Sequence, residues 1–478
     1  MTHATDLARG LSGNLNDRNP YIQGLYAPVR DEVTVLAPKV IGEIPSDLHG
    51  AYVRNGPNPS HMPTDLHHWF DGDGMLHAIY FENGKAEYRN RLIRSADIVA
   101  DLDGSCGAGG VLLPAHRERG EKVYKDTANT DVVCHNGTLM ALWYISGNPV
   151  RVDPRTLETI GEESFGGRLP RHVSAHSKVD NITGEFAFFD YSLYEPWMSF
   201  GVVSKDNVLT NFSRVPLPGP RLPHDMGLTE NYIILHDLPV VFSEQGRRQN
   251  LWRIEQRNQP ARFGVVPRNG RGDDVKWFET DPCYIYHVTN CWEDGDEVVM
   301  HACQMVPHGI GPNPKYGEYA PMVAVLKLHA VPVEWRMNVR TGAVKKRQLD
   351  DGIGEFPVVN LDYTGRKTRW SYHVSIAPGE MLLFDGLYKY DLESGARQTY
   401  RFEPGVFGSE AAFAPRVGSR DEDDGYVVVF VTSSSGQSEV RILNAKTFED
   451  GPVARVQLPT RVPIGFHATW VRGDQIAA

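Results

Sequence analysis

Short runs of hydrophobic residues follow one another along the chain, separated by glycine, proline, asparagine and aspartate. The runs are rich in valine, isoleucine, tyrosine and phenylalanine, which is the pattern of β-strands bounded by turns. Long stretches with helical periodicity are scarce. The pattern predicts an all-β protein. Representative runs are GTLMALWYI (residues 137–145), EFAFFDYSL (185–193), NYIILHDLPVVF (231–242), DEVVMHACQMV (296–306) and GYVVVFVTSS (425–434).

One pair of runs carries a specific hairpin signal. The segment FENGKAEY places Asn83-Gly84 between two alternating stretches, and this dipeptide is the strongest short-range indication of a tight β-hairpin. Many antiparallel strands at regular spacing, with no linker rich in proline or serine, predict one domain over residues 1–478 with residues 1–30 as an N-terminal arm. The architectures that fit are a β-propeller and, as the alternative, two stacked sandwiches. The chain has no WD repeat signature, so the pattern leaves the number of blades open.

Composition and charge narrow the class of protein. The 478-residue chain carries a formal net charge of −11, which argues against nucleic acid as a partner because phosphate binding needs a basic surface. No stretch approaches the ~18 apolar residues of a membrane-spanning helix, and the first residues lack the apolar core of a signal peptide. Weak contact with a membrane surface stays open. A cytoplasmic protein with reduced thiols is predicted from five cysteines without a CxxC pair: Cys106, Cys134, Cys283, Cys291 and Cys303.

Four of the eighteen histidines share a setting. Each lies at the inner end of one predicted strand, and a turn and the next strand follow it. In a propeller the innermost strands line the central axis, so such histidines could converge on one metal ion. Their separations form no local metal motif, and His172 with His176, or His67 with His68, compete as ligands. The four are His176, His224, His287 and His467.

Eight segments in a fixed order across residues 52–471 make the sequence recognisable. In chain order they are YVRNGPNP, HWFDGDGMLH, DTANTDVV, SAHSKVDNITGE, LPHDMGLT, YHVTNCWEDGDE, GEFPVVN and VPIGFHATWV. Together they resemble the carotenoid cleavage oxygenase family, which also includes stilbene-cleaving enzymes. The resemblance implies a seven-bladed β-propeller. It also implies a cap of loops that forms a substrate tunnel over an iron ion on the axis.

The resemblance further implies a set of site residues. Non-haem Fe(II) would be held by His176, His224, His287 and His467, and imidazole suits this metal. Glu355 and Glu410 match family glutamates that accept a hydrogen bond from the far side of a ligand ring, which fixes its tautomer and direction. Tyr144 stands where the family usually has another such glutamate. Thr130 matches a position whose methyl group crowds the open coordination site in some members.

The expected substrate follows from two family positions. Stilbene-cleaving members resemble one another in a tyrosine and a lysine that anchor a phenol; here Trp143 occupies the lysine position and residues 89–123 contain no tyrosine. We therefore expect a small apolar alkene, a carotenoid or apocarotenoid, cleaved with dioxygen to two carbonyl products, and keep stilbenoid cleavage as the alternative. Trp69, Phe70, Trp143 and Tyr144 are the candidate tunnel residues.

Two further expectations concern membranes and rival functions. Polyenes dissolve in membranes, so the tunnel mouth is expected to carry an exposed apolar patch that allows peripheral contact. The candidate for it is YEPWMSFGVV (Tyr194–Val203). The rival functions are an isomerase or hydrolase acting on a retinoid ester with the same iron, and a non-catalytic propeller that binds other proteins.

Overall fold

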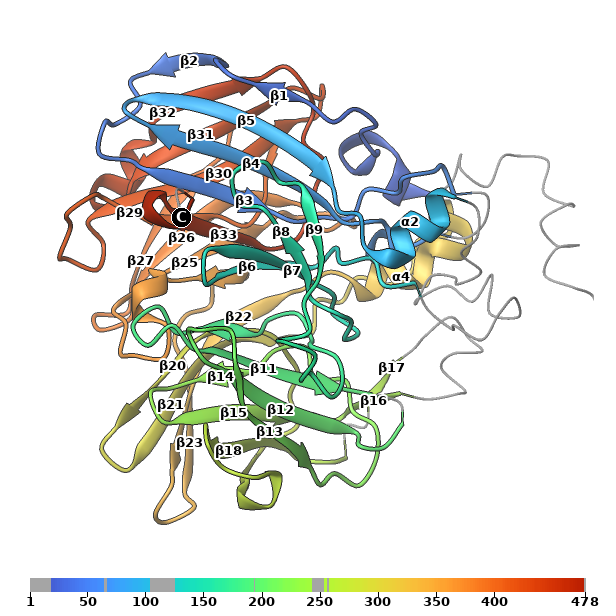
Figure 1. Ribbon diagram of the computed structural model, residues 1–478, viewed down its shortest axis with the longest axis vertical. Helices are drawn as coiled ribbons and strands as arrows, with labels where there is room; N and C mark the ends of the chain where they lie inside the picture. Colours follow the sequence, from blue (N-terminus) through green and yellow to red (C-terminus); the bar gives the residue numbers. More distant parts are fainter. Residues whose placement is uncertain are drawn as a thin grey trace, which may run out of the picture.

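A computed structural model of the protein describes residues 19–63, 67–103, 125–192, 194–242, 253–255 and 258–476. The described strands form seven antiparallel sheets of four or more strands and one additional two-stranded sheet. Figure 1 shows the large sheets following one another around the molecule, from blue through green and yellow to red, so that the last lies beside the first. The protein is a seven-bladed β-propeller, as the sequence resemblance implies.

The strand bounds, blade by blade, are as follows. Blade 1 contains β1 (Thr34–Val35), β5 (Lys85–Leu92), β4 (Met75–Glu82), β3 (Gly50–Arg54) and β33 (Ala468–Arg472); blade 2 contains β6 (Asp131–His135), β7 (Thr138–Leu142), β8 (Val150–Val152) and β9 (Thr159–Glu162); blade 3 contains β10 (Lys178–Val179), β11 (Phe186–Tyr191), β12 (Met198–Val203) and β13 (Leu209–Val215); blade 4 contains β14 (Gly227–Leu228), β15 (Tyr232–Asp237), β18 (Ala261–Pro267) and β19 (Lys276–Thr280). Blade 5 contains β20 (Ile285–Asp294), β21 (Glu297–Met305), β22 (Ala330–Asn338) and β23 (Val344–Gln348); blade 6 contains β24 (Gly354–Val358), β25 (Trp370–Ile376), β26 (Phe384–Asp391) and β27 (Ala396–Arg401); blade 7 contains β28 (Val406–Gly408), β29 (Ala412–Pro415), β30 (Gly425–Ser433), β31 (Ser438–Asn444), β32 (Pro452–Leu458) and β2 (Lys39–Gly42).

The remaining elements are short and connect or flank the blades. The two-stranded sheet pairs β16 (Val240–Phe242) with β17 (Arg253–Glu255). The helices in the described residues are α2 (Ala96–Leu102), α4 (Ala320–Val325) and α5 (Gly473–Ile476). Single 3₁₀ turns are η2 (Pro20–Ile22), η3 (Gly24–Tyr26), η4 (Trp69–Asp71), η5 (Gly272–Asp274) and η7 (Leu361–Tyr363), and longer, kinked 3₁₀ segments are η6 (Pro314–Tyr319) and η8 (Ala445–Asp450). No helix in the described part of the chain is long and apolar enough to cross a membrane.

The hydrophobic core lies between neighbouring blades. Side chains of blade 1, such as Tyr52 and Ile79, pack in one cluster with Val428 and Phe430 of blade 7. A neighbouring blade covers each face of a middle strand. Its residues are therefore apolar at successive positions instead of alternating between apolar and polar. Every residue of β12 is buried for this reason, whereas the outer strand β23 is mostly exposed.

Both ends of the chain take part in closing the ring. The C-terminal strand β33 pairs with β3 as the innermost strand of blade 1, and the N-terminal strand β2 pairs with β32 at the outer edge of blade 7. Blade 1 is therefore assembled from the two ends of the sequence. This closure carries His467, the residue immediately before β33, to the inner edge of its blade.

The hairpin predicted at Asn83-Gly84 is confirmed. Residues of β4 and β5 pair from Met75 opposite Leu92 to Glu82 opposite Lys85, which leaves a two-residue loop. Asn83 has a φ of 51° and Gly84 a φ of 72°. Two positive φ values in succession define a type I′ turn, whose twist matches that of the flanking strands.

Substitution of Gly84 tests the energetic contribution of this turn. A Cβ at Gly84 would meet only the carbonyl oxygen of Ile44, at 3.4 Å, so Gly84→Ala changes the backbone preference with little steric conflict. We expect a loss of about 1–2 kcal/mol in the free energy of unfolding, measured in urea, because alanine resists positive φ. Gly311→Ala is the matched control, since that glycine has an ordinary φ and open space around it. Equal stability of the two variants would contradict the prediction.

Segments outside the strands pack together at one side of the propeller. Tyr26 of η3 packs edge-on against Trp69 of η4 with 5.2 Å between ring centroids, and Tyr21 approaches Tyr319 of η6 at 6.5 Å. All four side chains belong to the same buried cluster as Phe466. Residues 20–26 thus pack against loops from distant blades.

Candidate metal centre and apolar pocket

The four histidines singled out in the sequence occupy equivalent places in four blades. His176 precedes β10, His224 precedes β14, His287 lies in β20 and His467 precedes β33. Each of these strands is the innermost of its blade in the pairing order. All four side chains are buried. The propeller therefore aims imidazoles from remote parts of the sequence at its axis.

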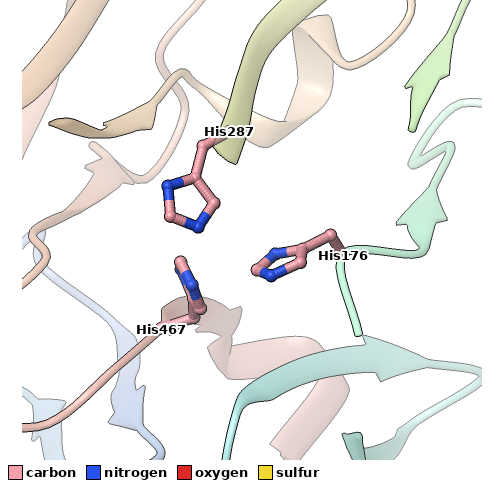
Figure 2. Close-up of side chains that lie close together, drawn as sticks. All are labelled: His176, His287 and His467. Atoms are coloured by element: carbon pink, nitrogen blue, oxygen red, sulfur yellow. The ribbon is translucent and has the colours of Figure 1, made fainter. Parts of the chain in front are cut away.

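The distances between the rings bring them into one cluster. Nε2 of His176 lies 3.1 Å from Nε2 of His224, and the ring centroids of His176, His287 and His467 are 4.4 to 4.9 Å apart. His224 lies 5.1 Å from His287 by the same measure. One ring nitrogen from each of His176, His287 and His467 lies within 4.8 Å of the others, and Figure 2 shows these three rings facing a common centre. Two nitrogens bound at right angles to one ion would be about 3 Å apart.

The protonation states of His176 and His287 fit a metal centre. Burial lowers the pKa of His176 well below its usual value and that of His287 to about 3, so both imidazoles are neutral and offer a lone pair at neutral pH. Burial opposes charge on His467 as well, but the charge of Glu410 and the hydrogen bond to it raise its pKa. Nε2 of His287 is buried and has no hydrogen-bond partner among the described residues. A buried lone pair directed at two other imidazoles is what a bound cation would satisfy.

Two glutamates lie behind two of the histidine rings. Nδ1 of His287 donates to Oε2 of Glu355 at 2.5 Å, and Nδ1 of His467 donates to Oε1 of Glu410 at 3.1 Å. A proton held at Nδ1 leaves the Nε2 lone pair free to face the centre. Burial raises the pKa of Glu355 well above its usual value. A cation on the opposite side of the His287 imidazole would lower this pKa again, because a nearby positive charge favours the ionised carboxylate.

Thr130 and Tyr144 lie on the same side of the cluster. The Thr130 hydroxyl donates to Oδ1 of Asn129 at 2.8 Å and accepts the Tyr144 backbone N–H at 3.2 Å. The Thr130 carbonyl accepts the backbone N–H of His467 at 3.2 Å. The Tyr144 ring lies 6.4 Å from the ring of His224. Tyr144, at the position where the family usually has a glutamate, is thus next to His224.

An apolar pocket ends at the histidine cluster. Trp69, Phe70 and Tyr144, expected as tunnel residues, line it, whereas Trp143 is absent from its lining and packs with its ring 6.1 Å from that of Tyr144. Every described residue of the lining is buried. The full lining is Trp69, Phe70, Thr130, Tyr144, His224, Tyr286, His287, Leu328, Phe356, Phe466 and His467.

Four pocket residues were not anticipated from the sequence. Tyr286, Phe356 and Phe466 are immediate chain neighbours of His287, Glu355 and His467, so adjacency to a ligand or its glutamate was the available signal. Leu328 gave no such signal. It follows helix α4, far in sequence from any histidine of the cluster.

The expected membrane-facing segment and the thiols also have defined places. Most of Tyr194–Val203 is strand β12, which is buried, so this part of the expected surface patch is wrong; Tyr194 itself is exposed. A buried middle strand and an exposed apolar patch share the same composition, which explains the error.

The cysteines were expected to be reduced thiols. The described cysteines are free thiols, as predicted, and Cys106 lies outside the described residues; the free thiols are Cys134, Cys283, Cys291 and Cys303.

Comparison with known proteins agrees with this geometry. A sequence model of the family described as retinal pigment epithelial membrane protein matches residues 26–472. The chain belongs to this family of carotenoid-cleaving oxygenases. It is 35% identical to a carotenoid 9,10(9',10')-cleavage dioxygenase of Crocus sativus and 34% identical to one of Phaseolus vulgaris, each match covering 95% of this chain and 90% of the relative.

A solved structure extends the comparison to three dimensions. The lignostilbene dioxygenase of Pseudomonas brassicacearum superposes with a TM-score of 0.85 at 26% identity, covering 95% of this chain and 99% of that one. The relatives are named as carotenoid cleavage dioxygenases, and this structural neighbour is also named as a dioxygenase. The protein is accordingly an alkene-cleaving dioxygenase of the carotenoid-oxygenase type.

Proposed function

We propose that this protein uses iron(II) and dioxygen to cleave a C=C double bond of a carotenoid or apocarotenoid, giving two carbonyl products. The observation that carries the proposal is an apolar pocket that ends at a buried cluster of imidazoles. An alkene in that pocket would present its double bond to the metal position in the absence of bulk water. The relatives named for carotenoid cleavage support the same substrate class.

The residues that would hold the metal are His176, His224, His287 and His467. Four neutral nitrogen ligands suit ferrous iron and leave its charge uncompensated. When bound, the iron would supply the activation of dioxygen that alkene cleavage requires. Glu355 and Glu410 orient two of the rings through Nδ1. Thr130, whose hydroxyl is engaged by Asn129 and Tyr144, would limit the space beside the metal.

The lining of the pocket favours a polyene over a phenol. The described lining contains no lysine, arginine, aspartate or glutamate, so these residues offer no charged group to stabilise a phenolate. Apolar and aromatic side chains such as Trp69, Phe70 and Phe356 would instead stabilise a hydrocarbon by roughly 0.8 kcal/mol per CH₂-sized unit removed from water. Stilbenoid cleavage stays the second candidate because of the similarity to the lignostilbene dioxygenase structure.

The proposal is tested by incubating iron-loaded protein under oxygen with a panel of apocarotenals and, separately, with hydroxystilbenes. We expect shortened apocarotenoid aldehydes, identified by mass spectrometry, from the first panel. Protein stripped of metal with a chelator is the control and should give none. Aromatic aldehydes from the hydroxystilbenes alone would replace the carotenoid substrate by the stilbenoid one. Turnover unaffected by metal removal would contradict iron dependence.

Peripheral contact with a membrane is part of the proposal. The supporting observation is that helix α2 exposes Val99 and Leu102 and helix α4 exposes Val325. Both helices lie outside the sheets in Figure 1. We expect the protein to co-sediment with phosphatidylcholine vesicles, and Leu102→Glu to weaken that association. Exposed Ile160, on the outer strand β9, provides the control variant Ile160→Glu. Equal co-sedimentation of both variants and wild type would count against this surface.

A further inference from the structure

The backbone is irregular at two of the four histidines. His176 has a φ of 64°, in the left-handed region that residues with a side chain rarely adopt. In the pairing of β20 with β21, the register shifts on both sides of Val288, the residue after His287. Such conformations persist only where the surrounding structure holds them, and β-bulges serve to redirect a side chain. Something must therefore fix the backbone at these ligands.

Asp131, a residue of blade 2, holds the backbone of His176. Its Oδ2 accepts the His176 N–H at 2.9 Å, and its Oδ1 accepts the N–H of Val132 at 2.8 Å. Asp131 is itself fixed, because its carbonyl accepts Nδ2 of buried Asn55 at 3.0 Å. The carboxylate thus reaches from one blade to the next and engages the residue in the left-handed conformation.

Asp225, the residue after His224, does the same for His287. The bulge removes the Val288 N–H from the regular ladder, and Oδ2 of Asp225 accepts it at 2.7 Å. Oδ1 of Asp225 accepts the N–H of Met226 at 2.6 Å and Nζ of Lys178 at 2.7 Å. The carboxylate is almost fully buried. Blade 4 thereby holds the irregular strand of blade 5.

We propose that Asp131 and Asp225 are positioning residues of the metal centre. They fix the backbone beside His176 and His287, so that these rings point at the axis before any metal is bound. Glu355 and Glu410 act on the imidazole rings themselves, whereas the two aspartates act on main-chain N–H groups. The inference rests on the proposed metal site, and it concerns how the protein prepares that site.

The test uses Asp131→Asn and Asp225→Asn. Asparagine keeps the side-chain volume but replaces one acceptor oxygen by an NH₂ group, which cannot accept from the facing N–H. Cobalt(II) serves as the probe, because its visible absorption reports ligand geometry. For each variant we expect a 10–100-fold loss of cobalt affinity and an altered absorption band.

Asp180→Asn is the matched control. Asp180 is also buried and also accepts a backbone N–H, that of Ile182 at 3.0 Å, but its ion pairs are with Arg268 and Arg366. This variant should lower the melting temperature and leave cobalt affinity and spectrum as in wild type. The inference is overturned if Asp131→Asn and Asp225→Asn also bind cobalt with wild-type affinity and spectrum. Failure of the wild type to bind cobalt would instead refute the proposed metal site.

Hydrogen exchange of the wild-type protein gives a second measurement that needs no variant. If the aspartates fix the backbone beforehand, peptides containing the amides of His176 and Val288 are protected in metal-free protein as strongly as in cobalt-loaded protein. Fast exchange that slows only on metal binding would show that the metal, and not the aspartates, orders these segments. That result overturns the inference even where the asparagine variants do not fold.

Discussion

Alanine in place of His224 is expected to abolish retention of iron and turnover of the alkene. Its Nε2 lies 3.1 Å from Nε2 of His176, which is the separation of two adjacent ligands on one ion. Mutation of a residue that only hydrogen-bonds to a metal ligand typically lowers metal affinity by about 10–100-fold. Loss of a ligand itself should therefore lower the affinity by more than roughly 100-fold. Metal analysis of the purified protein and cobalt titration measure this directly. The result decides whether the centre has four ligands or three.

His236→Ala is the appropriate comparison for this variant. His236 is also buried, lies in strand β15 of the same blade and packs edge-on against Phe263, 5.3 Å away. Its removal should lower stability but leave the metal content at the wild-type level. Full metal content and activity in His224→Ala would refute a four-histidine centre and leave His176, His287 and His467 as the candidate ligands.

Glu355→Gln is expected to lower metal affinity and activity by about 10–100-fold. The carboxylate accepts a hydrogen bond from His287 Nδ1 at 2.5 Å and thereby keeps the proton on Nδ1 and the Nε2 lone pair facing the proposed metal position. A glutamine amide that turns its NH₂ group toward Nδ1 would favour the opposite tautomer, in which Nε2 carries the proton and cannot bind. Cobalt titration and steady-state rates on the same preparation separate loss of metal from loss of activity per metal.

A second histidine–glutamate pair in blade 5 provides the control. Nε2 of His301 and Oε2 of Glu334 lie 3.1 Å apart, and this pair takes no part in the histidine cluster. Glu334→Gln should therefore affect stability without changing cobalt affinity. If Glu355→Gln and Glu334→Gln have the same effect on cobalt binding, Glu355 does not orient a ligand.

Local features of the fold were predictable because they depend on neighbours in the sequence. The Asn83-Gly84 turn requires two positive φ values, which this dipeptide adopts readily, and the apolar runs became the buried middle strands. The number of blades did not follow from the pattern, since no residue repeats at a fixed interval in every blade. It came from the resemblance of whole segments to a family.

The candidate metal centre was predictable only in part for a similar reason. His176 and His467 are far apart in the sequence and meet only because the propeller closes into a ring. No spacing rule in the sequence relates such residues. Resemblance supplied the four histidines together with Glu355 and Glu410. It did not supply Asp131 or Asp225, because their contacts are with main-chain N–H groups that become visible only in three dimensions.

The closure of the ring by β33 has a consequence for biosynthesis. His467 lies directly before this strand, and its backbone N–H and carbonyl bond to Thr130 and Asn55, close to the other end of the sequence. A nascent chain that has exposed His176, His224 and His287 still lacks the segment that joins its two ends. If the four histidines hold the metal as proposed, the full set of ligands would form only after translation has passed residue 472.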